Sequence, residues 1–272
     1  MCIRDSYEAD RAAGRTSATA TRDEDKISWN RGLLADLDRG RRRTYRSSAT
    51  RRATYRPFTH HHVHFDRDLN DMVYRLEDLF PTPRHGNVGF YSLNPGAAKP
   101  FSVLMSEDLP DLALYGSNAG QFFARWRYAA VEAEDGMLAL GPDEGQVVEG
   151  YRKIDNVTDE ALSRFRETYD AAFTKDDIFF YVYGLLHSSD YRQTYAADLK
   201  KSLPRIPLVT DAAPFVEAGR ELSDLHLGYE SVTPFALDGL GTNLEQSAPY
   251  EYFRVEKMRF AKVRDPETRK IV

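Results

Sequence analysis

The longest apolar stretch of the chain runs from Ile178 to Leu186 and predicts a buried helix. Every face of such a helix is apolar, which is typical of an element inside a protein core. The stretch is too short to cross a bilayer. Ser188, Ser189 and Asp190 then interrupt it and supply a candidate N-cap for a second helix. In that helix, apolar residues recur every four positions and form one buried stripe, at Tyr191, Tyr195 and Leu199.

Pro204 limits the second helix. A proline disfavours helical geometry in the residue before it, so we expect Leu203 to be the last helical position. Arg205 should then lie on a stiff extended segment. The tyrosines of both helices have two interpretations: stacking on nucleobases, or packing in the core with their hydroxyls satisfied at its edge. On helices this apolar the core interpretation is favoured, for Tyr181, Tyr183, Tyr191 and Tyr195.

The rest of the chain divides into a strand-rich and a helix-rich half. From residue 55 to about 128, short apolar segments alternate with Pro, Gly and Asn turns, which indicates strands. Those segments are Asn87–Leu93, Phe101–Met105 and Asp111–Tyr115. From Asn156 the pattern is helical, with Thr158 and Thr174 as candidate caps and an amphipathic stretch from Pro214 to Tyr229. The alternation in the last residues predicts a β-hairpin around residues 265–268.

These patterns predict an α+β fold with a β-rich N-terminal half, a helical half and a terminal β-hairpin. We expect three regions. Residues 1–38 show little apolar periodicity and indicate a poorly ordered lead-in. Residues 39–155 form the β-rich region and include a basic entry segment. Residues 156–272 form a helical scaffold with C-terminal strands.

Composition adds few constraints. The 272 residues are 42% hydrophobic and 29% charged, which is ordinary for a soluble globular protein. Cys2 is the only cysteine, so an intramolecular disulfide and a multi-cysteine zinc site are excluded. The sequence has no apolar run of membrane-spanning length and no apolar core of a signal peptide. We therefore expect a cytoplasmic protein without a membrane partner.

Charge is distributed unevenly along the chain. Residues 1–60 hold 14 Lys and Arg against 8 Asp and Glu, although the whole chain has a formal charge of −5. Between Arg39 and Arg56 there are eight arginines, no acidic residue, and two tyrosines, Tyr45 and Tyr55. Arginine at this density suits phosphate and guanine contacts, and tyrosine can stack or bind phosphate. The alternative is a solvated linker whose charge is incidental.

One segment also resembles a known family. The stretch YVYGLLHSSDYRQTYAADLKKSLPRIPL resembles the signature of the C-terminal specificity domain of type ISP restriction-modification enzymes, which translocate, methylate and cleave DNA. Further blocks of that family appear in the expected order over residues 40–260. They are Tyr55-Arg56-Pro57-Phe58, Leu79-Phe80-Pro81-Thr82-Pro83, Gln121 to Trp126, and Leu225-His226-Leu227-Gly228-Tyr229-Glu230.

The resemblance implies a target-recognition domain for double-stranded DNA. It also implies that the parent's N-terminal nuclease, motor and methyltransferase domains use Mg²⁺, ATP and S-adenosylmethionine. The sequence lacks a G-x-x-x-x-G-K-[ST] loop, a G-x-G-x-x-G fingerprint and an Asn-Pro-Pro-Tyr motif. We therefore predict no catalytic residue, metal or cofactor in this chain, and we expect it to be a fragment truncated at both ends.

The candidate DNA-binding residues fall into two groups. The basic entry segment would anchor phosphates, and side chains on strands and loops of the β-rich region would read base edges in the major groove. Arg125 and Arg127 alternate with Trp126 and Tyr128 and would reach a groove from a strand. The full set is Arg41, Arg42, Arg43, Arg46, Arg51, Arg52, Arg56, His60, His62, Arg125 and Arg127.

Two other functions remain open. His60, His62 and His64 would share one face of a strand, and imidazoles so placed can bind a divalent metal, as in a stand-alone metal-dependent hydrolase. No H-E-x-x-H context or paired carboxylate motif completes such a site. The second alternative is an interaction module in which the helices dock a methyltransferase or helicase domain.

Overall fold

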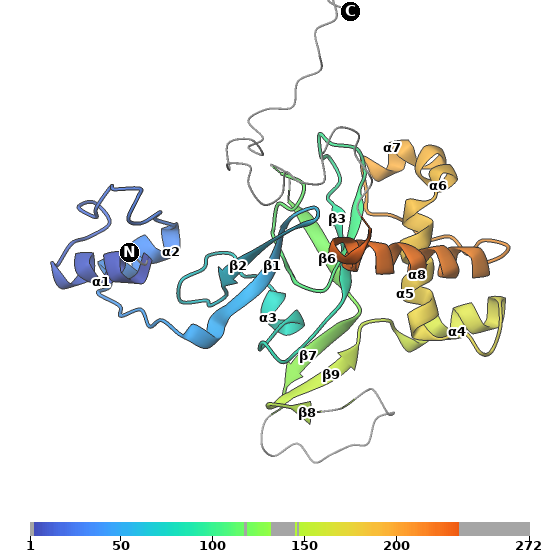
Figure 1. Ribbon diagram of the computed structural model, residues 1–272, viewed down its shortest axis with the longest axis horizontal. Coiled ribbons are helices and arrows are strands. Elements are labelled where there is room, and N and C mark those ends of the chain that lie inside the picture. The colour runs from blue at the N-terminus through green and yellow to red at the C-terminus, as the bar shows by residue number, and fades with distance from the viewer. Residues whose placement is uncertain (1–2, 117–118, 132–144, 146, 234–272) are drawn as a thin grey trace, which may run out of the picture. The chain divides into compact units, whose positions relative to one another are not determined.

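Strands precede most of the helices in the described chain (Figure 1). The computed structural model describes residues 3–116, 119–131, 145 and 147–233. Within them the strands form three sheets of three strands each. The predicted α+β class is confirmed, with the strand-rich part before the helix-rich part. The terminal β-hairpin expected around residues 265–268 lies outside the described residues.

The first sheet has the order β2-β1-β5 and contains an antiparallel hairpin. Strands β1 (Thr50–Arg56) and β2 (Thr59–His64) form that hairpin, and β5 (Leu109–Pro110) pairs in parallel with β1. Thr54 on β1 is buried, and its hydroxyl oxygen lies 2.6 Å from that of Ser106. This buried contact ties the hairpin to the second sheet.

The second and third sheets follow the predicted apolar segments. The second has the order β4-β3-β6, and every residue of β3 (Gly89–Leu93) and β4 (Val103–Ser106) is buried. The segment 111–115 is a turn instead of the expected strand, because the Asp111 carboxylate accepts the Ala113 backbone N–H and competes with strand pairing. The second sheet is completed by β6 (Gly120–Ala124). The third sheet has the order β7-β9-β8 and consists of β7 (Trp126–Ala130), β8 (Val147–Val148) and β9 (Tyr151–Asp155).

Two helices of the helix-rich half begin at the capping residues that the sequence indicates. Thr158 caps α4 (Asp159–Thr168) and Thr174 caps α5 (Lys175–His187), as predicted, and Asp177 completes a capping box with Thr174. No helix within the described ranges is both long and apolar enough to cross a membrane. The other helices are α1 (Ile3–Ala12), α2 (Arg31–Asp38), α3 (Leu76–Leu79), α6 (Ser189–Thr194), α7 (Ala196–Leu199) and α8 (Ala213–Leu227), with 3-10 turns η1 (Ser47–Ala49) and η2 (Tyr229–Ser231).

Helices α5 and α8 cross at two glycines. A Cβ atom at Gly184 would lie 2.1 Å from the Phe215 carbonyl oxygen, and one at Gly219 would lie 2.0 Å from that of Phe180. The backbones therefore touch directly at the crossing. Around it, side chains of α5 form the main core together with Phe90 and other residues of the second sheet. This core packs the helices against β3 and β4 of the second sheet.

The tyrosines on α5 lie in this core, as predicted. Tyr181 and Tyr183 are fully buried and Tyr191 is 6% exposed. The prediction is wrong for Tyr195, which is 39% exposed because the backbone leaves the helical conformation at this residue. Helical structure ends at Leu199, not at Leu203, and it is interrupted at Tyr195, whose φ and ψ of −103° and 18° are not helical. Leu203 is itself exposed, so burial does not favour extending the helix to the proline.

Residues 3–38, expected to be a poorly ordered lead-in, contain α1 and α2. Tyr7 from α1 packs with Leu33 and Leu37 from α2 and with Ile27 between them. Asn30 caps α2 by accepting the Leu33 backbone N–H. The apolar residues of this cluster come from separate segments, so no single periodic pattern indicates it.

A pH dependence follows from His187 at the end of α5. Burial, and to a smaller extent the charges of Arg192 and His226, lowers the pKa of His187 to about 4. As the pH falls, His187 is therefore protonated in the unfolded chain at a higher pH than in the folded protein. Stability should therefore be lost between about pH 6.5 and pH 4, by on the order of 2 kcal/mol. Urea unfolding at pH 7 and pH 5 measures this loss. His187→Gln should flatten the dependence, and an equal slope in the variant would contradict the assignment.

Candidate functional site

A cleft of about 620 Å³ lies between the start of β1, helix α3 and the third sheet. Its walls include Pro81, Thr82 and Pro83 on one side, and Tyr128 on β7 and Tyr151 on β9 on the other. Two acidic side chains, Glu77 and Asp78, also line it. Four arginines from different segments converge on this cleft, namely Arg46, Arg51, Arg75 and Arg127.

Arg51 forms part of the fixed wall of the cleft. Its guanidinium donates hydrogen bonds of 2.9 Å to the carbonyl oxygens of Phe80 and Pro81 and lies 5.6 Å from the centre of the Phe65 ring. Burial lowers the pKa of Arg51 from its ordinary value, yet arginine stays charged at physiological pH. Arg51 therefore adds a positive charge to the cleft while its contacts hold the segment after α3.

The other three arginines of the cleft are accessible cations at its rim. Arg46 is paired with Asp66 at 2.8 Å, but two thirds of its side chain is exposed. Hydrogen bonds from Arg46 and from the Asp68 backbone outweigh burial and lower the pKa of Asp66. Arg75 pairs with Asp78 at 2.8 Å. The Arg75–Asp78 pair is exposed and contributes little stability, so Arg75 can exchange its carboxylate for another anion. Asp66 is only 3% exposed, so Arg46 keeps this partner through its Nε and offers its terminal N–H groups to an anion.

Arg127 is the least constrained cation in the cleft. It lies on β7 opposite Ile154 of β9, its side chain is exposed, and no ion pair or side-chain hydrogen bond holds it among the described residues. Its neighbour Tyr128 points inward and donates a hydrogen bond of 2.6 Å to the Gly86 carbonyl oxygen. The strand therefore presents a free guanidinium to the cleft from a rigid backbone.

Arg125, expected to share this role, lies inside the protein. It is 5% exposed and forms ion pairs with Asp155 and with Asp176, the latter at 2.7 Å. Arg125 sits between β6 and β7, where its backbone N–H bonds to the Val88 carbonyl oxygen at 2.7 Å. Because Arg125 lies between two strands of different sheets, it does not share the exposed face of β7 with Arg127. Its buried side chain cannot reach a DNA groove.

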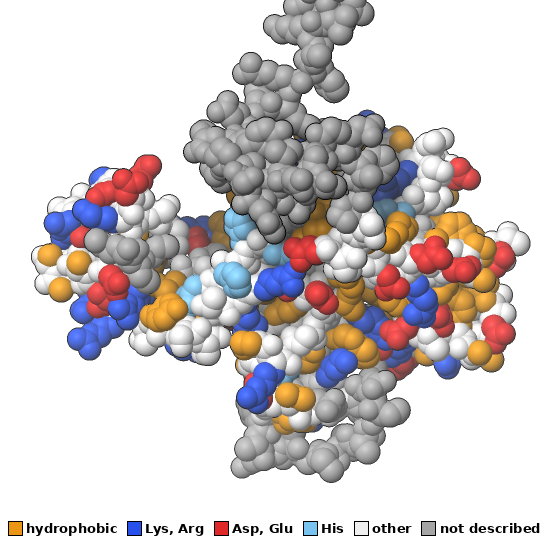
Figure 2. Space-filling view, viewed as in Figure 1, with side chains coloured by type: hydrophobic (Ala, Val, Ile, Leu, Met, Phe, Trp, Pro, Cys, Tyr) orange, Lys and Arg blue, Asp and Glu red, His pale blue; other side chains and the backbone are white. Residues whose placement is uncertain are grey.

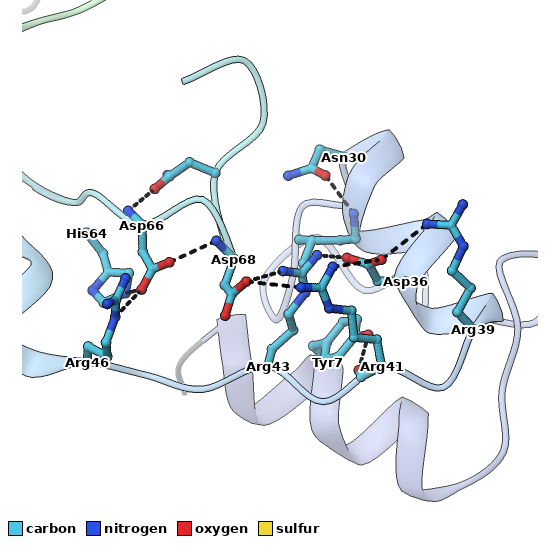
Figure 3. A network of polar contacts seen from close by, with 12 residues as sticks. Tyr7, Asn30, Asp36, Arg39, Arg41, Arg43, Arg46, His64, Asp66 and Asp68 are labelled. Carbon is cyan, nitrogen blue, oxygen red and sulfur yellow. Dashed lines mark hydrogen bonds and ion pairs between the residues drawn. The ribbon is translucent and has the colours of Figure 1, made fainter. Parts of the chain in front are cut away.

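Arg43 is also buried, although it lies within the basic entry segment (Figure 3). It pairs with Asp36 of α2 and, at 2.9 Å, with Asp68. Arg41 shares these carboxylates at 3.9 and 3.8 Å with most of its side chain exposed. Arg42 is exposed and has no ion pair within the described part of the chain. In this part of the entry segment, two accessible arginines therefore precede a structural one.

Four of the seven histidines lie on β2, and Figure 2 shows pale blue side chains over the β1–β2 hairpin. His60 lies 3.0 Å from an Asp108 oxygen and stacks on Tyr229, so it joins the hairpin to η2. His64 stacks on Tyr45. His62 is exposed. Across the described residues, no three His, Cys, Asp or Glu side chains converge as metal ligands, and the hydrolase alternative lacks the geometry it needs.

The last two arginines of the predicted set also lie on β1. Arg52 pairs with Asp108 at 3.3 Å and Glu230 at 3.5 Å, and nearly half of its side chain is exposed. The Arg56 guanidinium lies 4.0 Å from the centre of the Tyr55 ring and 3.6 Å from Asp111. Both can be reached from solvent, but their carboxylate partners reduce the net charge of this face.

The sequence did not indicate several residues of the cleft. Arg75 and Tyr151 come from regions without a charge run, and only the fold brings them beside Arg46 and Arg127. The segment 81–83 belongs to a family block, but nothing in the sequence placed it in the cleft. Arg75 follows Tyr74 in a sequence of mixed charge, which gave no signal. The carboxylate partners of the buried arginines were equally hidden, because they lie 7 to 51 positions away.

Comparison with known proteins identifies relatives of the chain. The family model described as the type ISP C-terminal specificity domain matches residues 2–272. None of the curated proteins compared with the chain matches it significantly. Three similar solved structures contain DNA. The ATP-dependent type ISP restriction-modification enzyme LlaBIII bound to DNA is 27% identical with a TM-score of 0.71, and the match covers 87% of this chain and 14% of that one.

The second structure is the DrdV–DNA complex, 28% identical with a TM-score of 0.71, where the match covers 97% of this chain and 24% of the other. The third is a nuclease-deletion mutant of the type ISP restriction-modification enzyme LlaGI with a DNA substrate mimic. It is 32% identical with a TM-score of 0.68, and the match covers 86% of this chain and 20% of the other. The chain thus spans less than a quarter of the length of each of these proteins.

Proposed function

The chain belongs to the type ISP C-terminal specificity domain family, and we propose that it recognises a short sequence in double-stranded DNA for a restriction-modification enzyme. The observation that carries the proposal is the cleft in which Arg46, Arg75 and Arg127 present exposed guanidinium groups from three separate segments. Guanidinium groups fit phosphate oxygens in a bidentate geometry, and contacts of this kind fix the position of a protein on a duplex.

In this mechanism the accessible arginines anchor the phosphate backbone. Arg41 and Arg42 extend the contact from the cleft along the entry segment. Each phosphate contact displaces counterions, so binding should depend strongly on salt concentration. Arg43, Arg51 and Arg125 act indirectly, because they hold the elements that carry the anchors.

We assign base reading to the accessible side chains of the β1–β2 hairpin, where Arg52 and His62 are paired positions. A two-stranded ribbon fits the major groove of B-form DNA, where each base pair presents a distinct set of donors and acceptors. Arg52, Arg56 and His62 lie on this hairpin with accessible polar atoms. His60, two positions from His62 and on the same face, fixes the turn end of the ribbon through Asp108 and Tyr229. The helical half serves as the scaffold.

Catalysis in the parent enzyme belongs to partner domains of the same polypeptide in this proposal. Those domains would bind Mg²⁺, ATP and S-adenosylmethionine for nuclease, motor and methyltransferase activities. The described residues of this chain offer no set of three converging metal ligands. The role proposed for the chain itself is therefore recognition of the DNA sequence.

The proposal predicts weaker DNA binding when the rim of the cleft is neutralised. The double variant Arg75→Ala with Arg127→Ala should bind duplex DNA about 10- to 100-fold more weakly and show a shallower salt slope, by about one for each phosphate that is no longer neutralised. Fluorescence anisotropy across a salt series measures both quantities on a duplex selected by the wild-type protein from a random pool.

A matched control is available in the helical half. Arg164 and Arg205 are also exposed, so replacing both by Ala changes the total charge equally. Neither forms an ion pair in the described part of the chain. The control should stay within about twofold of wild type, since its phosphate anchors are intact. Equal effects in both double variants would mean that net charge alone governs binding, and the cleft would not be the site.

A further inference from the structure

The loop before α3 has two non-glycine residues with a left-handed backbone. Met72 has a φ of 56° and Tyr74 a φ of 48°. Positive φ is unfavourable for bulky side chains and persists only where the surrounding structure enforces it. Two such residues within three positions mark a segment whose shape is held by the surrounding structure.

This backbone directs apolar side chains into solvent. Tyr74 is 60% exposed and Met72 is 46% exposed, while Val73 between them is buried at 8%. Val73 therefore pins the loop to the protein and lifts its neighbours outward. The exposure adds an unfavourable hydration term to the backbone strain. Neither feature improves folding, so their coincidence points to a role in binding.

The surroundings of Tyr74 are cationic. Arg67 donates a hydrogen bond of 3.5 Å to the Tyr74 carbonyl oxygen, and Arg75 follows directly in the chain and lines the arginine cleft. Their side chains are 66% and 84% exposed. They pair with Glu77 and Asp78 near the surface, where ion pairs contribute little stability and exchange readily. The loop therefore forms a rim of the proposed DNA site.

We propose that Tyr74 is a base-stacking wedge: when the cleft binds a duplex, the ring enters an opened base step while Arg67 and Arg75 hold the flanking phosphates. The inference rests on the proposed function. Proteins that deform DNA insert apolar side chains between base pairs and compensate the disrupted base stacking with new contacts. Met72, two positions earlier, is a second exposed apolar side chain of the loop. Only two apolar side chains project here between charged residues, which is too small an apolar surface for stable docking of a protein.

The test uses duplexes in which 2-aminopurine replaces one adenine at a time, within a sequence selected by the wild-type protein from a random pool. Unstacking of the probe raises its fluorescence. Wild-type protein should raise it at one or two adjacent positions. Tyr74→Ala should abolish this rise and weaken binding roughly 5- to 150-fold, as expected when one base stack is removed. The salt slope should not change, because the arginines that bind phosphate are still present.

Two variants separate this role from folding. Tyr74→Phe keeps the ring and should retain both the fluorescence rise and an affinity within about threefold of wild type. Tyr74→Gly removes the ring and relieves the positive φ, so its melting temperature should not fall although its binding does. Leu225→Ala removes a similarly exposed apolar side chain from α8 and should leave both readouts unchanged.

The outcomes distinguish this inference from the proposed function. Wild-type protein that binds no duplex would overturn both. Normal duplex binding with equal affinity and fluorescence for Tyr74→Ala would overturn the wedge alone. Unchanged DNA binding by Tyr74→Ala, together with abolished association with the separately purified N-terminal part of a parent enzyme, would assign the loop to a protein interface instead.

Discussion

Arg125→Ala should lower the free energy of unfolding by about 3 to 5 kcal/mol, because the substitution leaves a buried carboxylate without its main partner. Arg125 and Asp155 have side chains that are each 5% exposed. Asp155 would retain a backbone hydrogen bond from Val157 and a distant Lys175 ammonium at 3.9 Å. These interactions do not replace a guanidinium that also lies 4.1 Å from the centre of the Trp126 ring.

The melting temperature measures this effect, with an expected fall of roughly 10 °C for a domain of this size. Arg127→Ala is the matched control, since it removes the same group two positions away from an exposed site. The control should melt within about 2 °C of wild type and bind DNA more weakly instead. An Arg125→Ala protein that melts like wild type but selects a different DNA sequence would restore Arg125 as a reader of bases.

The contrast between Arg125 and Arg127 shows where sequence patterns lose information. Residues two apart in one strand share a face, so alternation with Trp126 and Tyr128 places both arginines together. The rule fails because β6 ends at Ala124 and β7 begins at Trp126. Arg125 occupies the junction between two sheets, and no local pattern marks that junction.

Helix positions were predicted well where the signal is local. A cap such as Thr174 acts within its own helical turn, so its residue type and the apolar run after it are sufficient. The end of α7 depends on whether Leu203 is buried, which is a tertiary property. The cluster of Tyr7, Ile27 and Leu33 was not predicted, because its residues come from separate segments and meet only in the tertiary structure.

The candidate site was predicted in part. A run of arginines without acidic residues indicates an anion-binding surface, and Arg46 and Arg51 do line the cleft. The sequence cannot separate accessible arginines from structural ones, because the carboxylates that bury Arg43 come from distant positions. Arg75 and Tyr74 lie in a segment of mixed charge, and only the backbone geometry and exposure draw attention to them.

Gly219→Ala should prevent stable folding, because it places a new atom against backbone at the crossing of α5 and α8. The new Cβ would lie 2.0 Å from the Phe180 carbonyl oxygen, well inside van der Waals contact. Alanine has a higher helix propensity than glycine by about 1 kcal/mol, and this gain offsets only a small part of the destabilisation. The overlap is with rigid backbone, so the helices must separate and open the core, at an expected cost above about 4 kcal/mol.

Thermal unfolding followed by circular dichroism should show a large fall in the melting temperature or no cooperative transition. Gly184→Ala should behave similarly, because its Cβ would lie 2.1 Å from the Phe215 carbonyl oxygen. Gly86→Ala is the control for the same chemical change, since nothing lies within 4 Å of its Cβ position. A Gly219→Ala protein as stable as this control would mean that the helices do not cross here in solution. The hairpin would then lack the fixed support that His60 receives from Tyr229 after α8, and with it the geometry on which the proposed base reading depends.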